Sequence, residues 1–280
     1  HVRSRRQRQM CIRDRISTYN QPLWLEKVLL GYMQQDFRDF EVIIADDGST
    51  EETRKLINKY RNKTFFPIKH VWQEDLGFRK TIILNKAILS SNSDYLIFTD
   101  GDCIPRKDFI TTHIAYRTHK HYLSGGYIKL SREVSNAIEK SDIENQLCFD
   151  KNWLIEKGQK NNFKLTKLHR STLLKSIMNR ITTTAPTWNG HNSSGWKKDI
   201  LEVNGFDERM VYGGEDRELG ERLCNNGIRA KQIRFSAICI HLDHDRNYVK
   251  RAGLKQNNNI REITVSEKIT WTDHGIKEKS

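Results

Sequence analysis

Apolar and polar positions follow two different periods along the first third of the chain, and these predict alternating strands and helices. Short apolar runs predict strands, whereas apolar residues spaced about 3.6 positions apart predict helices. The expected elements are strands at 16–19, 40–45, 68–72 and 95–99 and helices at 22–33, 51–61 and 80–89. Such alternation indicates a largely parallel α/β sheet that binds ligands at the carboxyl ends of its strands.

The pattern becomes less regular after residue 105. We expect helical segments and a strand at 122–130 between residues 105 and 184, together with a basic amphipathic helix at 164–181. Residues 188–245 are dense in glycine, tryptophan, histidine and acidic residues and include a predicted strand at 233–240. Residues 246–280 predict an irregular, partly helical tail.

The net charge of +13 is concentrated at the start of the chain, where residues 1–15 contain six arginines and one aspartate. Residues 10–15, MCIRDR, resemble the translation of a sequencing adapter, so we expect a non-native head and a native chain that begins near Ile16. A genuine basic arm for nucleic acid or membrane is the alternative. Without the head, 42 basic and 34 acidic residues leave +8, which suits a protein that meets phosphate groups or an anionic membrane face.

Composition excludes several classes of protein. No stretch approaches 18 consecutive apolar residues, so we expect no membrane-spanning helix. Five scattered cysteines without a C-x-x-C pair indicate a reducing, cytoplasmic compartment rather than a disulfide framework or zinc ribbon. Aromatic residues do not alternate with basic ones as a base-stacking series would, so we expect no nucleic-acid partner.

Acidic residues follow two of the predicted strands, as Asp46-Asp47 and as Asp100-Gly101-Asp102. Two carboxylates one residue apart can bind Mg²⁺ or Mn²⁺, which in turn can hold a diphosphate. An ordinary aspartate-rich turn is the alternative.

Glycines precede acidic residues in Gly213-Gly214-Glu215-Asp216, at the start of a predicted helix. Glycine allows close approach of a ligand, and a carboxylate there can act as a general base. The alternative is a simple helix cap. Because the helix dipole lowers a carboxylate pKa, Asp216 needs partial burial to remain a useful proton acceptor.

Two further features carry open alternatives. His241 and His244 follow the predicted strand at 233–240, and their spacing allows both imidazoles to bind one metal ion or to serve structural roles. The basic amphipathic helix at 164–181 can lie on an anionic bilayer or pack its apolar face on the core.

Three ordered motifs together resemble a known family over residues 16–245. Ser17-Thr18-Tyr19-Asn20, FEVIIADDGS and YLIFTDGDCIP are similar to the nucleotide-binding half of family 2 glycosyltransferases. NGHNSSGWKKDILEVNGFDERMVYGGEDRELGERLCNNG resembles the C-terminal module of β-1,4-galactosyltransferases, and residues 78–85 resemble that family's F-x-R-x-K-L-L-N helix. The resemblance implies the GT-A fold, a Rossmann-like, mostly parallel α/β sheet flanked by helices.

The resemblance also implies roles for individual residues. Asp46 and Asp47, helped by Ser17 and Tyr19, would recognise uracil and ribose, and Lys80 would lie near the donor. Asp100 would contact the ribose or the metal, and Asp102, His241 and His244 would bind Mn²⁺ or Mg²⁺. Asp216 would act as the base, with Glu215 as its acidic neighbour. The residues that would line the substrate are Trp188, Gly190, Tyr212, Gly213 and Gly214.

By this resemblance the chain divides into a head (1–15), a nucleotide-sugar-binding half (16–110), a variable acceptor or membrane-proximal segment (111–185), a catalytic-base half (186–245) and a tail (246–280). Residues 105–185 match the galactosyltransferases poorly, so no acceptor is implied. The arginine-rich head replaces an apolar first strand, so we expect an incomplete uridine pocket and an under-paired sheet.

The leading hypothesis is a metal-dependent, inverting, cytoplasmic glycosyltransferase, peripheral to the inner membrane face. It would move a sugar from a UDP-sugar to a glycan or lipid-linked acceptor in surface polysaccharide or lipopolysaccharide synthesis. A non-catalytic sugar-nucleotide or glycan-binding protein of the same fold is the alternative. A nucleotidyltransferase ranks last because no glycine-rich triphosphate loop precedes a basic residue.

Overall fold

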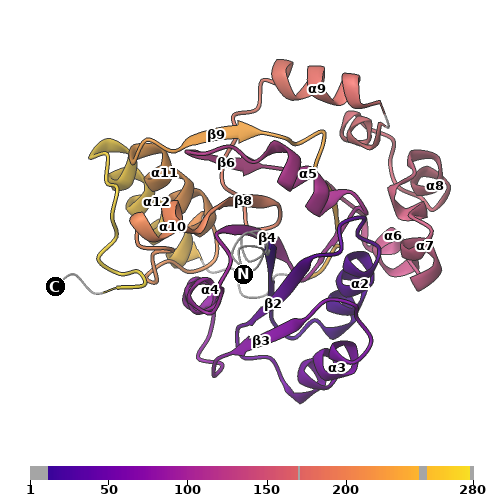
Figure 1. Ribbon diagram of the computed structural model, residues 1–280, viewed down its shortest axis with the longest axis horizontal. Coiled ribbons are helices and arrows are strands. Elements are labelled where there is room, and N and C mark those ends of the chain that lie inside the picture. The colour runs from indigo at the N-terminus through magenta and orange to yellow at the C-terminus, as the bar shows by residue number, and fades with distance from the viewer. Residues whose placement is uncertain (1–11, 170, 246–250, 278–280) are drawn as a thin grey trace, which may run out of the picture.

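The computed structural model describes residues 12–169, 171–245 and 251–277 and has an α/β architecture (Figure 1). A seven-stranded sheet forms its centre, with strand order β3-β2-β1-β4-β8-β6-β9. Its strands are β1 (Ile12–Thr18), β2 (Phe40–Asp46), β3 (Ile68–Trp72), β4 (Tyr95–Asp100), β6 (His121–Ser124), β8 (Ser193–Trp196) and β9 (Arg229–Gln232). The predicted α/β class and mostly parallel sheet are confirmed, with β8 as the antiparallel strand.

The parallel half agrees closely with the periodicity of the sequence. Helices α2 (Pro22–Met33), α3 (Glu51–Arg61) and α4 (Lys80–Leu89) and strand β3 have the expected bounds. β2 and β4 are each one residue longer than expected, and that added residue is Asp46 in β2 and Asp100 in β4. Both acidic clusters therefore begin at the carboxyl ends of parallel strands.

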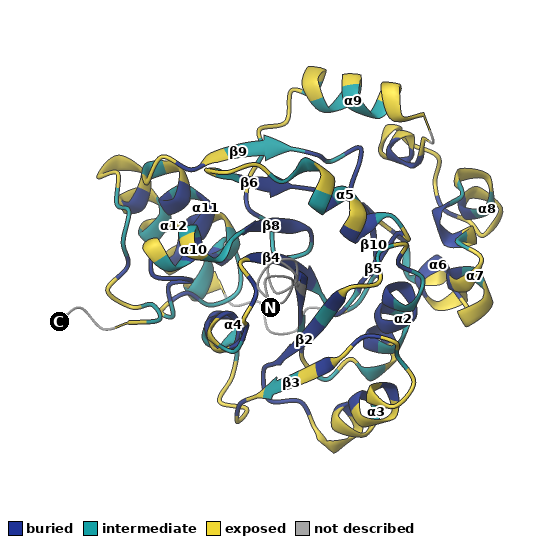
Figure 2. Cartoon of the chain, in the orientation of Figure 1, coloured by how far each residue is buried: buried dark blue, intermediate teal, exposed yellow. Residues whose placement is uncertain are grey.

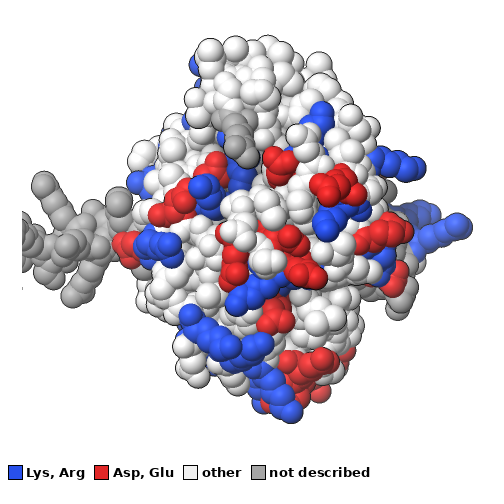
Figure 3. All heavy atoms as spheres, turned by 90° about the vertical axis from the view of Figure 1, so that its right-hand side faces the viewer, with Lys and Arg blue, Asp and Glu red and all other residues white. Residues whose placement is uncertain are grey.

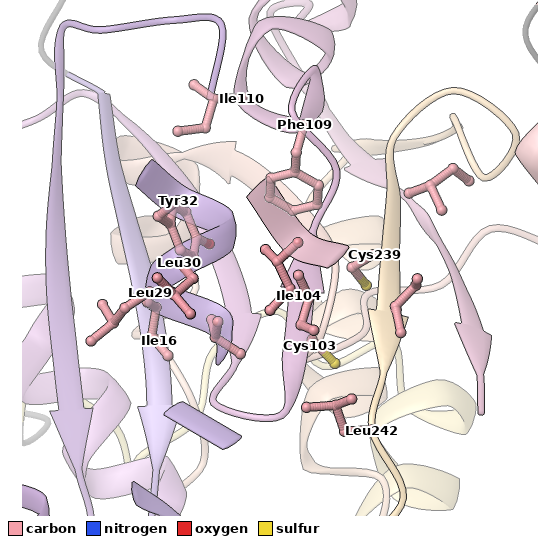
Figure 4. Packing of buried hydrophobic residues seen from close by; sticks show 14 of the residues in the cluster. Ile16, Leu29, Leu30, Tyr32, Cys103, Ile104, Phe109, Ile110, Cys239 and Leu242 are labelled. Carbon is pink, nitrogen blue, oxygen red and sulfur yellow. The ribbon is translucent and has the colours of Figure 1, made fainter. Parts of the chain in front are cut away.

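β1 begins at Ile12, four residues before the expected strand, and so includes the last residues of the predicted head. It is hydrogen-bonded along its length to β2 and β4, so the expected gap in sheet pairing is absent. Backbone pairing does not require apolar side chains, and Ile12 and Ile16 still supply core contacts on the α2 face. Figure 4 shows Ile16 beside Leu29 and Tyr32 of α2. Residues 1–11 lie outside the described part of the chain.

A second, three-stranded sheet has the order β5-β10-β7 and consists of β5 (Cys103–Pro105), β7 (Gly126–Lys129) and β10 (Ile238–His241). The predicted strand at 122–130 divides at Gly125, because its first part joins the large sheet and its second part the small one. A Cβ on Gly126 would lie 2.0 Å from the Arg234 carbonyl oxygen, so this close approach requires glycine. The strand expected at 233–240 is shorter, comprising β10 alone.

Helices surround the two sheets, and the last element of the chain is also a helix. The remaining helices and 3₁₀ turns are α5 (Phe109–Tyr116), α6 (Arg132–Ala137), α7 (Lys140–Glu144), η1 (Leu147–Phe149), α8 (Lys151–Glu156), η2 (Phe163–Leu168), α9 (Thr172–Ile181), α10 (Lys197–Glu202), α11 (Glu215–Asn225) and α12 (Arg251–Ser266). The basic helix expected at 164–181 is thus two elements, η2 and α9. The tail expected to be irregular contains the 16-residue helix α12, which packs on α11.

Buried apolar side chains form two clusters, one on each face of the large sheet (Figure 2). The larger lies under α2 and extends to the second sheet, while the smaller lies under α4, α10 and α11. Among the described residues, none of the helices is both long and apolar enough to cross a membrane.

Candidate active site

The candidate site forms where β1 and β4 end side by side. Their parallel register places Ser17 opposite Asp100, and the Ser17 hydroxyl donates a 2.6 Å hydrogen bond to Asp100 Oδ1. Lys80, the first residue of α4, places its Nζ 2.6 Å from the same oxygen. Burial alone would lower the pKa of Lys80, but the Asp100 carboxylate, with Glu215 and Asp216 farther away, raises it above its usual range. The ammonium and the Asp100 carboxylate are therefore both charged at neutral pH.

Asp102, His241 and His244 form a compact group of metal-binding type. The antiparallel pairing of β5 with β10 places His241 opposite Cys103, next to Asp102. His244 Nε2 is 2.7 Å and His241 Nε2 3.6 Å from Asp102 Oδ2, and one ligand atom from each residue lies within 4.8 Å of the others. Although burial opposes it, the two imidazoles hold the pKa of Asp102 well below its usual range. One carboxylate and two imidazoles suit a divalent transition-metal ion.

The loop before α11 places the predicted base beside this region. Gly213 and Gly214 adopt φ values of 105° and 93°, in the left-handed region that favours glycine. This turn starts α11 at Glu215, so Asp216 lies in its first turn. Asp216 is half-buried, as expected for a proton acceptor at this position, and its Oδ2 accepts a 3.0 Å hydrogen bond from the Gly190 amide.

Glu215 is a buried neighbour with a different environment. Its Oε2 accepts a 2.8 Å hydrogen bond from the Gly213 amide, which tightens the glycine turn. Burial first, and then the adjacent Asp216, raise the pKa of Glu215 to about 7, while Lys80 opposes the shift. Near neutral pH, Glu215 is therefore present in both its protonated and its ionised form.

Gly190 joins the three groups into one site. A Cβ added to it would lie 3.1 Å from Lys80 Nζ and 3.6 Å from both Asp100 carboxylate oxygens, while its amide binds Asp216. A residue with a side chain would therefore intrude between these charged groups. The predicted base Asp216, the Lys80 ammonium and Asp100, the first acidic residue of the D-x-D pair, therefore converge on this glycine.

The residues expected to bind uridine lie at the ends of β1 and β2. Asp46 is buried and accepts hydrogen bonds from the Ser49 amide at 2.8 Å and pairs with His70 Nε2 at 2.8 Å. Asp47 accepts from Gln73 Nε2 at 2.6 Å and from the Arg79 amide at 2.8 Å. Burial raises the pKa of Asp47. Both carboxylates thus organise the loops that surround this edge.

Tyr19 and Ser17 are placed differently from each other. The Tyr19 hydroxyl donates a 2.8 Å hydrogen bond to Asp75, and 43% of this residue is exposed. Ser17 instead belongs with Asp100 and Lys80. The structure therefore places Tyr19 at an exposed position on Asp75, apart from Ser17, which lies at the centre of the site.

The two aromatic residues expected to line the substrate also differ. Tyr212 is partly exposed and packs edge-on against Phe78 at 5.8 Å between ring centroids. Trp188 is fully buried and packs against Phe98 and Tyr122 in the smaller core cluster. Trp188 therefore supports the site from beneath, whereas Tyr212 lies at its surface.

Two polar residues at the site, His191 and Asn257, were not predicted from the sequence. The His191 ring lies 4.4 Å from the Tyr127 ring and 6.5 Å from the His241 ring, and burial lowers its pKa to about 4. The fully buried Asn257 of α12 donates to the Val211 and Gly213 carbonyls at 2.7 and 2.9 Å. His191 adjoins a glycine that the sequence did single out, but no motif marks Asn257.

Two family models match this chain. The family model described as "Glycosyl transferase family 2" matches residues 16–185, more than half of the chain. A second model, described as the N-terminal domain of galactosyltransferase, matches residues 175–245. The latter range contains Gly190, Glu215, Asp216 and both histidines of the metal-binding group.

Individual proteins are also similar to this chain in sequence or in fold. A validoxylamine A glucosyltransferase from Streptomyces hygroscopicus subsp. jinggangensis is 28% identical, over 76% of this chain and 51% of that protein. This chain thus spans about half the length of that relative. The crystal structure of S. aureus TarS 1-349 in complex with UDP-GlcNAc has a TM-score of 0.63 at 17% identity, over 92% of this chain and 69% of that one. The structure of GalNAc-T7 with UDP, GalNAc and Mn²⁺ has a TM-score of 0.65 at 11% identity, over 91% and 48%.

Proposed function

This chain belongs to glycosyl transferase family 2, and we propose that it is a metal-dependent, inverting glycosyltransferase that takes its sugar from a UDP-sugar. The acceptor we propose is a hydroxyl of a glycan or lipid-linked glycan, as in surface polysaccharide or lipopolysaccharide synthesis. The TarS and GalNAc-T7 structures, which share the fold, are complexes with UDP-GlcNAc and with UDP and Mn²⁺, and this supports a uridine nucleotide as the donor.

The observation that carries the proposal is the convergence of opposite chemical roles on Gly190. Its amide hydrogen-bonds Asp216, and its α-carbon lies against Lys80 and Asp100. In this proposal, a sugar whose anomeric carbon lies over Gly190 has the Asp216 carboxylate on one side and the Lys80 ammonium, paired with Asp100, on the other. A single displacement at that carbon requires such a base and such a leaving-group site on opposite sides.

Asp216 acts as the general base in this proposal. It would take the proton from the acceptor hydroxyl as the oxygen attacks the anomeric carbon, and the configuration of that carbon inverts. The Gly190 and Arg217 amides, at 3.0 and 2.7 Å, fix the orientation of its carboxylate. Glu215 lies behind it and holds the glycine turn, so only one of the two acidic side chains faces the acceptor.

The donor set of Asp102, His241 and His244 fits a divalent cation. Mg²⁺ strongly prefers oxygen ligands, whereas two imidazoles favour a transition-metal ion. Mn²⁺ is the ion in the GalNAc-T7 complex that shares the fold, and we therefore propose Mn²⁺. When bound, the cation would neutralise the negative charge of the departing nucleoside diphosphate. Lys80 and Asp100 border the same space, and the Lys80 ammonium adds a fixed positive charge there.

The proposal is tested by measuring UDP release from a panel of UDP-sugars, with Mn²⁺ or with a chelator. We expect Mn²⁺-dependent release from one donor in the presence of a glycan acceptor. Metal-dependent UDP binding with no turnover on any acceptor would instead support the alternative of a sugar-nucleotide-binding protein. If well-folded protein does not bind UDP, the assignment of the nucleotide site is wrong.

A further inference from the structure

Helix α9 turns its apolar side outward, which is the reverse of an ordinary amphipathic surface helix. None of its ten residues, all of which the structure describes, is buried. Leu173 is 71% exposed, Ile177 44% and Ile181 65%, and their spacing of four residues places them on one face of the helix. Figure 1 draws α9 at the outer edge of the molecule, and Figure 2 shows most of it as exposed.

The polar side of α9 faces the protein instead. Asn179 donates a 2.8 Å hydrogen bond to the Ser236 hydroxyl and accepts one of 2.9 Å from the Phe235 amide. Burial lowers the pKa of Lys175, and the nearby Arg106 adds to that shift. The alternative in which the segment 164–181 packs its apolar residues on the core therefore holds for Leu165 and Leu168 of η2, which are buried, but not for α9. Polar residues of α9 bind it to the rest of the protein, and its apolar residues remain available to bind a partner.

The segment that carries the exposed face has one sign of charge along the sequence. The acidic residue that acts on α9 is Asp108, which lies near Lys175 on the side that faces the protein. From Lys157 to Lys198 the sequence contains no aspartate or glutamate, and residues 157–181 contain seven lysines and arginines. Lys160, Lys164 and Arg180 are exposed within this stretch, as is Phe163, of which 70% is accessible. The uppermost lobe of the surface in Figure 3 is white with blue at its margins and has no red.

We propose that this face docks on an anionic lipid bilayer. We define the α9 face as the exposed residues Leu173, Leu174, Ile177, Arg180 and Ile181 of α9 together with the exposed residues Lys160, Phe163 and Lys164 of the preceding segment. An outward apolar stripe bordered by lysine and arginine binds the interface of a membrane through burial of its apolar side chains and attraction to anionic lipids. The lack of any acidic residue over this long stretch favours lipid over a protein partner of mixed charge.

Docking there would hold the membrane at a segment that leads directly into the candidate active site. Residues 182–187 connect α9 directly to Trp188 and Gly190, so the helix and the site are six residues apart along the chain. A lipid-linked acceptor held in that bilayer would be presented near Gly190. This consequence rests on the proposed function, whereas the docking itself depends only on the chemistry of the α9 face.

The test is co-sedimentation of the full chain with vesicles of phosphatidylglycerol and phosphatidylethanolamine, compared with vesicles of phosphatidylcholine alone. We expect binding to the anionic vesicles only. The triple change L173Q/I177Q/I181Q should weaken the partition coefficient about tenfold or more. The triple change K160E/K164E/R180E should weaken it by about 100-fold, because each basic residue contributes to attraction at an anionic surface.

The matched control is L89Q/V265Q, which removes two side chains of similar exposure, 55% and 56%, from other helices. Its binding should equal that of the unchanged chain. Every variant keeps the same basic residues 1–15, so any binding by that segment is common to all and cannot produce a difference. UDP release with a soluble acceptor should be unchanged in all three variants, which separates this proposal from the proposed function.

Three results would overturn the proposal. The unchanged chain could fail to sediment with anionic vesicles, or the α9 variants could sediment as well as the control. The third is self-association of the unchanged chain in sedimentation velocity that L173Q/I177Q/I181Q abolishes, because the α9 face would then join two copies of this chain.

Discussion

Charged side chains with little exposure occur in two regions of the central sheet: half-buried at the carboxyl ends of its strands and fully buried in the middle of β1. At the strand ends, Asp100 meets Lys80 at 2.6 Å and Asp102 meets His244 at 2.7 Å. In the middle of β1, Asp14 and Arg15 are both fully buried. Both regions contain aspartate carboxylates, but the groups that surround these carboxylates differ.

The hydrogen-bond partners of Asp14 are neutral groups, namely hydroxyls and the Arg15 backbone amide, and the Arg15 charge opposes the effect of burial only in part. Its Oδ1 accepts a 3.1 Å hydrogen bond from Thr99, and its Oδ2 has no hydrogen-bond partner among the residues that the structure describes. Burial raises its pKa to about 7. Arg15 lies on the other face of the strand, with its guanidinium carbon 5.2 Å from the centre of the Phe98 ring.

This difference in partners means that the charges at the strand ends can serve a function, whereas the buried charge of Asp14 lowers the stability of the fold. A cation or imidazole beside a carboxylate keeps it ionised despite burial, as a metal or substrate site requires. Hydroxyl groups cannot do so, and the Asp14 carboxylate is destabilised instead. The comparison predicts that changes at the strand ends alter activity, whereas changes in β1 alter the free energy of unfolding.

The largest expected effect is that of Asp216→Asn. The amide cannot accept the proton but can still accept the Gly190 hydrogen bond, so we expect the turnover number to fall by about three orders of magnitude. UDP binding, measured by calorimetry, should not change. Glu202→Gln, which alters a carboxylate on α10, is the control. Unaffected transfer by Asp216→Asn would show that the base lies elsewhere.

The next effect concerns the metal-binding group. His244→Ala removes one of its three ligands, and we expect the Mn²⁺ concentration for half-maximal activity to rise by about 100-fold. High Mn²⁺ should restore part of the activity, and paramagnetic resonance should report the weaker binding directly. His274→Ala, which changes an exposed histidine, should have no effect. An unaltered Mn²⁺ requirement in the His244 variant would contradict this site.

A smaller effect is expected in β1, and it should depend on pH. The folded protein keeps a proton on Asp14 that the unfolded chain releases, since its pKa rises from 3.8 to about 7 on folding. Stability should therefore fall as the pH rises through this window. Asp14→Leu should remove the dependence and raise the free energy of unfolding by about 2 kcal/mol at a pH of about 8. Urea titrations at several pH values measure both.

The control for β1 is Asp39→Leu, because Asp39 is an exposed carboxylate just before β2. It should leave the pH profile of stability unchanged. If Asp14→Leu lowers activity while stability stays constant, the contrast between the two regions fails. The sequence resemblance expects an apolar run in this strand, and the substitution restores part of it.

Local signals in the sequence were sufficient for the parallel half of the fold. The bounds of α3, β3 and α4 follow from apolar periodicity, and Asp46 and Asp100 were correctly expected at strand ends. The break at Gly125 was not predicted, because a pair of glycines within an apolar run does not reveal that the chain changes sheets there. Periodicity predicted an amphipathic character for α9 but could not indicate which face points inward.

The candidate site needed more than local signals. Asp102 and His241 are far apart in sequence and meet through the pairing of β5, a three-residue strand too short to show a period. Only the family resemblance placed them together. The role of Asn257 has no signal at all, because a buried asparagine on a polar helix looks like its exposed neighbours until its partners are known.

Asn257 gives the smallest and most specific prediction. It is buried and polar, like Asp14, yet its side chain is satisfied by the Val211 amide and by the Val211 and Gly213 carbonyls. Those groups form the loop that places Glu215 and Asp216. Asn257→Ala should therefore lower the turnover number about tenfold through misplacement of the base, with KM for the donor unchanged.

The exposed neighbour Asn258 offers a matched control on the same helix, and Asn258→Ala should behave as the unchanged chain. A purely structural role for Asn257 would instead lower the melting temperature and leave the turnover number of the folded fraction intact. Substitution by Asp, which keeps the acceptor for the Val211 amide but loses both donors, should give the same loss of turnover. If Asp restores full turnover, the two carbonyl hydrogen bonds do not position the base.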